Sequence, residues 1–90
     1  SFIIEIIGGV FLIPYLIIAD LETILKISII MTYFILLAFE LLNTAIELLS
    51  DKITKDFDLD IKKIKDTSSA AVFVILLLLI ILIILSFLIF

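Results

Sequence analysis

The sequence predicts an all-α membrane protein, with three transmembrane helices forming one domain over residues 1–90. Hydrophobic residues make up 66% of the chain and the mean hydropathy is +1.53, well above the content of soluble domains. They fall into three apolar runs, separated by a short polar turn and a lysine-rich connection. The sequence has no cysteine and no histidine, which excludes thiol chemistry and the usual general base near neutral pH. A net charge of −4 without arginine does not indicate nucleic-acid binding.

Residues 2–19 form the first predicted transmembrane helix. A helix of this length, rising about 1.5 Å per residue, nearly covers a hydrocarbon core of about 30 Å. Glu5 is the only charged residue in this run. Pro14 should kink the helix because proline removes a backbone hydrogen bond, and Gly8 and Gly9 would allow a neighbouring helix to approach closely.

The second transmembrane helix is predicted over residues 23–49 and the third over residues 67–90. Between them, residues 50–66 hold five of the six lysines, and their apolar residues recur at the spacing of a surface helix broken near Asp58. Because lysine-rich connections stay on the cytoplasmic side, this one should be cytoplasmic. That topology would bring several polar residues near one depth, at the cytoplasmic boundary: Glu5, Glu40, Glu47, Lys65 and Asp66.

Polar side chains form a stripe on the second predicted helix. Its members fall within an arc of roughly 100° on a helix that turns by about 100° per residue; they are Glu40, Asn43, Thr44, Glu47 and Asp51. Ionisable residues are costly inside a membrane, so such a stripe faces protein or water and is a candidate functional site. One subunit cannot cover it, and we therefore expect the chain to associate.

Carboxylates beside a lysine at a membrane boundary suit phosphoryl transfer from a magnesium nucleotide, because Mg²⁺ prefers oxygen ligands and often binds only one or two protein carboxylates. Glu47, at the wetter depth, suits a metal ligand, and Glu40, at the drier depth, suits a general base. Lys65 can pair with phosphate oxygens, and Asn43 lies one turn from both glutamates. Periodicity alone leaves three classes open: an enzyme, a proton or cation path, and a structural subunit joined by a polar seam.

Two segments give a more specific signal. The first is Glu40-Leu-Leu-Asn43-Thr44-Ala45-Ile46-Glu47 followed by Asp51, and the second is Ile64-Lys65-Asp66-Thr67-Ser68-Ser69-Ala70-Ala71-Val72. They resemble the patterns E-x-x-N-S/T-A-I-E-x-x-x-D and A-K-D-x-x-S-A-A-V of the prokaryotic diacylglycerol kinase family, at that family's spacing. The start Phe2-x-Ile4-Glu5 also resembles the family's entry into its first helix, so the resemblance spans essentially the whole chain.

The resemblance implies a small kinase of the bacterial inner membrane, built as a homotrimer of three-helix subunits with its active site on the cytoplasmic side. Such an enzyme would use ATP with Mg²⁺ as cofactor to phosphorylate the hydroxyl of diacylglycerol, giving phosphatidic acid. Undecaprenol is the alternative lipid substrate within the family. A non-catalytic membrane scaffold is the alternative outside the enzymes.

Roles for individual residues follow from the matched motifs. Glu40 corresponds to the family's catalytic base, and Glu47 to a magnesium ligand that also contacts the nucleotide. Asn43 and Glu5 match polar residues of the active site. The resemblance further implies nucleotide contacts at Asp56, Lys65 and Asp66, and lipid-substrate contacts at Glu5, Glu40 and Ser69.

The chain also departs from the family pattern. Ile64 stands where alanine is usual, and Asp58 stands where a histidine or similar polar residue is usual. The family's N-E-x-x-F segment, whose glutamate is its second metal ligand, would align just before Ser1. We therefore expect that residues preceding Ser1 are missing here, that the fold and oligomer are retained, and that magnesium binding and turnover are weakened.

Overall fold

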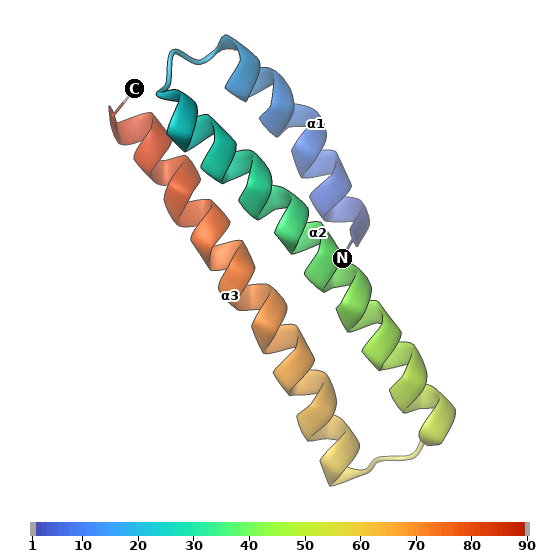
Figure 1. Cartoon of the computed structure of the whole chain (residues 1–90). Helices are drawn as coiled ribbons and strands as arrows, with labels where there is room; N and C mark the ends of the chain where they lie inside the picture. The colour runs from blue at the N-terminus through green and yellow to red at the C-terminus, as the bar shows by residue number, and fades with distance from the viewer. Residues whose placement is uncertain (1, 90) are drawn as a thin grey trace.

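The computed structural model describes residues 2–89 and consists of three helices, α1 (Phe2–Ile18), α2 (Thr23–Ile53) and α3 (Leu59–Ile89). In Figure 1, α2 and α3 run antiparallel along their whole length, and α1 lies beside the N-terminal half of α2. The molecule is a rod of 51 × 19 × 15 Å. The described residues contain no strand, so the predicted all-α class is confirmed.

This arrangement divides the rod into two parts. In the three-helix part (residues 2–39 and 72–89), α1 packs beside the α2–α3 pair. In the hairpin end (residues 40–71), only α2 and α3 lie side by side, joined by a short linker (Figure 1). The sequence motifs that resemble the kinase family fall almost entirely in the hairpin end.

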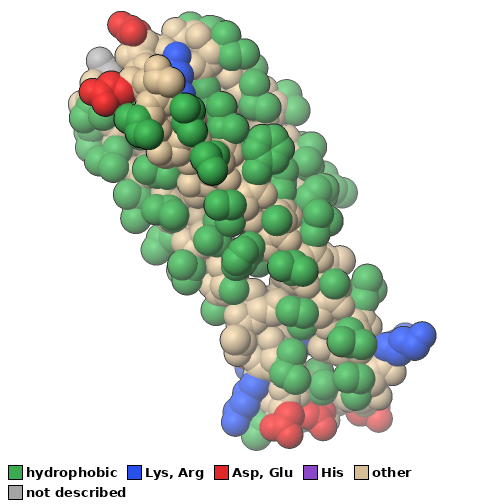
Figure 2. All heavy atoms as spheres, in the orientation of Figure 1, with side chains coloured by type: hydrophobic (Ala, Val, Ile, Leu, Met, Phe, Trp, Pro, Cys, Tyr) green, Lys and Arg blue, Asp and Glu red, His purple; other side chains and the backbone are tan. Residues whose placement is uncertain are grey.

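The helices have the length and hydropathy of membrane segments. Both α2 and α3 have 31 residues, with mean hydropathies of 2.0 and 3.7 over their most apolar stretches, and each is long enough to cross a membrane. Helix α1 is apolar but has only 17 residues, and it continues unbroken past Pro14. Figure 2 shows charged side chains gathered at the two ends of the rod and hydrophobic side chains over the surface between them, as expected of a membrane protein.

The connection between α2 and α3 is shorter than the sequence predicted. Helix α2 continues to Ile53 and α3 begins at Leu59, so residues 59–66 are the first turns of α3 rather than a separate surface helix. Asp58 explains the early start: its Oδ1 accepts a 3.0 Å hydrogen bond from the Ile61 amide, as a helix N-cap does. The predicted break near Asp58 is therefore present, as the boundary of α3.

The core lies between the three helices of the three-helix part. Ile29 and Leu36 of α2 are fully buried and pack in one cluster with Leu16 of α1 and Leu79 of α3. Ser86 of α3 is also fully buried. Its hydroxyl lies 2.9 Å from the Tyr15 hydroxyl and donates a 2.6 Å hydrogen bond to the Ile83 carbonyl. One neutral hydrogen bond, between Tyr15 and Ser86, thus joins α1 to α3 inside an otherwise apolar core.

Helices α1 and α2 approach closely at Gly9. A Cβ placed on Gly9 would overlap the hydroxyl and ring of Tyr33, and the Tyr33 hydroxyl donates a 2.9 Å hydrogen bond to the Glu5 carbonyl. At Gly8, no atom of the described residues lies within 4 Å of the corresponding position. The predicted close approach is confirmed for Gly9 and is wrong for Gly8, which faces open space beside the bundle.

Candidate functional site

The polar stripe of α2 lies in the hairpin end, where three of its side chains follow one another about one turn apart and form a polar row: Asn43, Glu47 and Asp51. Asn43 Nδ2 donates a 2.7 Å hydrogen bond to Glu47 Oε1, and Asp51 follows one turn later. Thr44 turns its hydroxyl back to the Glu40 carbonyl at 3.0 Å, a local bond that takes it out of the row. Asn43 and Glu47 therefore form one preorganised unit, as their four-residue spacing allows.

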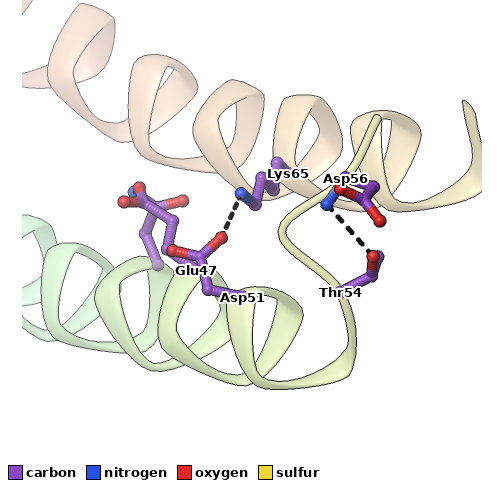
Figure 3. A network of polar contacts seen from close by, with 6 residues as sticks. Glu47, Asp51, Thr54, Asp56 and Lys65 are labelled. Carbon is purple, nitrogen blue, oxygen red and sulfur yellow. Dashed lines mark hydrogen bonds and ion pairs between the residues drawn. The ribbon is translucent and has the colours of Figure 1, made fainter. Parts of the chain in front are cut away.

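Asp51 joins α2 to α3 across the hairpin. Its Oδ1 lies 2.7 Å from Lys65 Nζ. Figure 3 shows the side chains of Glu47 and Asp51 extending from α2 toward α3, with Lys65 extending from α3 to meet Asp51. Asp51 lies beyond the predicted membrane span, and the hydrogen bond and charge of Lys65 hold the pKa of its carboxyl below the ordinary value.

A polar cavity of about 240 Å³ opens at the tip of the hairpin. The linker and the first turns of α3 form its walls, which are Lys55, Asp56, Phe57, Asp58, Ile61, Lys62, Lys65 and Asp66. Three of the four residues predicted to contact the nucleotide, Asp56, Lys65 and Asp66, thus share one cavity, whereas Glu47 is not on its wall. The linker shapes it through Thr54, whose hydroxyl accepts a 3.1 Å hydrogen bond from the Asp56 amide (Figure 3).

The lysines and carboxylates of this cavity are sorted into pairs. Lys62 Nζ lies 2.6 Å from Asp66 Oδ2, one turn along α3, while Lys65 pairs with Asp51 of α2 rather than with Asp66. Sequence reasoning missed both pairings. The four-residue spacing of Lys62 and Asp66 predicts such a pair on a helix, whereas no sequence signal specifies the pair between α2 and α3.

The residues expected at one depth are instead spread along the rod. Glu40 and Glu47 are roughly 10 Å apart along the axis of α2. Glu5 lies at the level of Tyr33, whose hydroxyl donates a hydrogen bond to its carbonyl, and this level is about 20 Å from Glu47 along the same axis. The expectation of a common depth is wrong because α1 reaches only the middle of α2 (Figure 1).

Two apolar grooves lie along the rod. One, of about 520 Å³, runs between α2 and α3 in the hairpin end and has Asn43 on its wall. The other, of about 450 Å³, runs between α1 and α3 in the three-helix part and has Glu5 on its wall. Neither groove is lined by Glu40, which is half-buried, or by Ser69, which is exposed. The residues expected to contact lipid therefore do not lie together in either groove.

The donor set suits a magnesium ion that is bound mainly by phosphate oxygens. No cluster of three acidic side chains occurs among residues 2–89, so the described protein groups do not form a complete metal cage. Glu47 is exposed, and the buried Oδ1 of Asn43 has no hydrogen-bond partner within the described part of the chain. One carboxylate beside a polar oxygen fits the usual binding of Mg²⁺, which keeps waters and substrate phosphates.

Fold and site together define an all-α membrane protein whose charged side chains gather around a cavity at one end of a helical hairpin. The family model described as "Prokaryotic diacylglycerol kinase" matches residues 1–87, and the chain belongs to that family of lipid kinases. The resemblance carried by the two motifs is thereby confirmed. A comparison with curated proteins finds no match.

Proposed function

We propose that this protein transfers the γ-phosphate of ATP, bound with Mg²⁺, to the hydroxyl of diacylglycerol, giving phosphatidic acid. It would act as a homotrimer in the bacterial inner membrane, with the active site facing the cytoplasm. The main support is the cavity that brings Asp56, Lys65 and Asp66 together just beyond the Asn43–Glu47 pair.

The spread of the site along the rod suits a reaction between a lipid and a nucleotide. A lipid hydroxyl approaches from the membrane, toward half-buried Glu40, and a nucleotide approaches from water, toward the cavity at the tip. Glu47 lies between them. Because these groups are spread along the rod, each substrate has an end of its own. Groups at a single depth would not separate the two substrates in this way.

The reaction requires a base at the lipid end and positive charge at the phosphate end. The oxygen of the lipid hydroxyl would attack the γ-phosphorus while the bond from that phosphorus to the β-phosphate oxygen breaks. Glu40 would accept the proton of the hydroxyl. Lys65 would hold phosphate oxygens as a point charge. Glu47, oriented by Asn43, would hold the metal. Bound Mg²⁺ supplies neutralisation of the charge that develops on the phosphate oxygens.

Association into trimers would complete the site. A single chain leaves Glu47 exposed and leaves the buried Asn43 Oδ1 without a partner among the described residues. Polar groups at membrane depth are satisfied by facing protein or water. Neighbouring copies can provide that cover along the hairpin end, where α1 does not reach (Figure 1).

The test is ATP-dependent phosphorylation in mixed micelles with magnesium, with diacylglycerol and undecaprenol as separate acceptors. Glu40→Gln removes the base and should lower the rate by about 100-fold or more. Glu22→Gln, at the opposite end of α2, is the matched control and should retain the wild-type rate. Transfer to undecaprenol alone would make undecaprenol the substrate in place of diacylglycerol. A rate that Glu40→Gln leaves unchanged, or transfer to neither lipid even after the segment expected before Ser1 is restored, would contradict the proposal and favour a scaffold.

A further inference from the structure

Asp51 has no part in the chemistry described above, yet it makes the one ion pair between α2 and α3 found in the described residues. It lies one turn beyond Glu47 in the polar row, and its partner Lys65 lies on the wall of the cavity. We infer that Asp51 is a positioning residue, which holds the Lys65 ammonium group between the polar row and the cavity, ready for a nucleotide phosphate. The inference rests on the proposed function, which makes Lys65 a phosphate contact.

The choice of partner supports this role. Asp66 follows Lys65 in the chain and lines the same cavity, but it is paired with Lys62 at 2.6 Å. Lys65 instead reaches across to α2, fourteen residues away in sequence. The ammonium group is thereby drawn toward the side of the hairpin that presents Glu47, as Figure 3 shows.

The chemistry of lysine leaves capacity for a ligand. An ammonium group has three N–H donors, and the bond to Asp51 uses one of them. A lysine side chain loses rotamer entropy when it is fixed in one position. If Asp51 has already restricted Lys65, a bound phosphate does not bear that cost. Loss of Asp51 should therefore weaken nucleotide binding although Asp51 carries the same sign of charge as the phosphate.

A purely structural role is the competing explanation. The Lys65 and Asp51 side chains keep 37% and 50% of their surface exposed, and exposed ion pairs add little to stability. The five-residue linker and the contacts of α2 with α3 also hold the two helices together. A structural brace predicts a lower melting temperature without a specific effect on ATP, so the two explanations differ in what they predict for the KM.

The experiment measures the KM for ATP, kcat and the melting temperature of the full chain in lipid–detergent micelles. Asp51→Asn should raise the KM for ATP by about tenfold, because ATP must then restrict the Lys65 side chain as it binds, with kcat and melting temperature close to wild type. Asp51→Glu should recover part of the loss. Asp60→Asn, on the exposed first turn of α3, removes the same charge nearby and should leave the KM unchanged.

A double variant makes the test specific to Lys65. If Asp51 acts through Lys65, then adding Asp51→Asn to Lys65→Met should not raise the KM for ATP further. A KM that Asp51→Asn leaves unchanged or lowers, or an equal rise in both backgrounds, would overturn the inference while the kinase stays active. A wild-type chain that stays inactive even after the segment expected before Ser1 is restored would contradict the proposed function itself, and the role of Asp51 with it.

Discussion

The three-helix part and the hairpin end use different interactions. In the three-helix part, buried Ile29 and Leu36 pack against α1 and α3, and the polar contacts are neutral hydrogen bonds such as that of Tyr33 with the Glu5 carbonyl. In the hairpin end, the polar contacts between side chains are ion pairs and an amide–carboxylate bond, and most of these groups are exposed. Burial of apolar groups stabilises a fold far more than exposed ion pairs do. The comparison teaches that stability resides in one part and ligand chemistry in the other.

The largest expected effect is a loss of activity, without a loss of stability, when a residue of the hairpin end is changed. Glu47→Gln keeps the size of the side chain but removes the charge proposed to hold Mg²⁺. Phosphoryl transfer should fall by about 100-fold or more, as when an electrostatic group is removed from an active site. The melting temperature should stay at the wild-type value. A variant that melts early, or one that keeps its activity, would contradict a division between stability and chemistry.

The two neighbouring glycines of α1 provide the next test, on stability. Gly9→Ala places a methyl group against Tyr33, and such overpacking should cost about 1–2 kcal/mol of unfolding free energy. Gly8→Ala meets open space and should gain up to about 1 kcal/mol from higher helix propensity. Unfolding in micelles measures both values, and equal values would refute the close packing of α1 at Gly9. Adding Tyr33→Phe should make the cost of Gly9→Ala smaller, because it removes the overlapping hydroxyl.

A smaller effect on the unfolding free energy is expected when one polar contact is removed from each part. Tyr33→Phe removes a partly buried hydrogen bond and should lower the unfolding free energy by about 1 kcal/mol. Lys62→Gln removes an ion pair whose two side chains are 57% and 65% exposed, and should change it by at most about 0.5 kcal/mol. The same unfolding assay measures both. A larger loss for Lys62→Gln would mean that ion pairs stabilise the hairpin end after all.

The smallest effect concerns pH. Lys65 lowers the pKa of Asp51 in the folded protein, so the stabilisation from this pair is present above the ordinary aspartate value and is lost as the pH falls through the lowered one. The small stability difference between wild type and Asp51→Asn should therefore stay constant from about pH 7 to about pH 5 and close below about pH 4. A difference that already closes between about pH 7 and pH 5 would show that the pair does not form in solution.

Much of the fold could be predicted from the sequence because hydropathy alone identifies long apolar helices. The break near Asp58 was also predictable, since aspartate is a favoured N-cap. The length of the connection was not: the charges of residues 59–66 indicated a surface segment, but the Asp58 cap lets α3 begin there. Periodicity describes one helix at a time and gives no information on how far neighbouring helices overlap.

The candidate site shows the same limit. The stripe of α2 and the two motifs identified Glu40, Asn43, Glu47 and Lys65 from spacing and resemblance. The link between Asp51 and Lys65 could not be predicted, because it depends on the relative rotation of α2 and α3 about their axes. The common depth expected for Glu5 and Glu47 failed for a related reason, since it assumed that α1 reaches as far as α2 does (Figure 1).

The most direct test of the central claim is amide hydrogen exchange with and without MgATP, in micelles that contain the lipid acceptor. The account predicts that the nucleotide slows exchange in the linker, residues 54–58, and in the first turns of α3, while the turn at residues 19–22 at the opposite end of the rod is unaffected. Protection confined to the three-helix part, or no change anywhere along the chain, would contradict a nucleotide site at the tip of the hairpin.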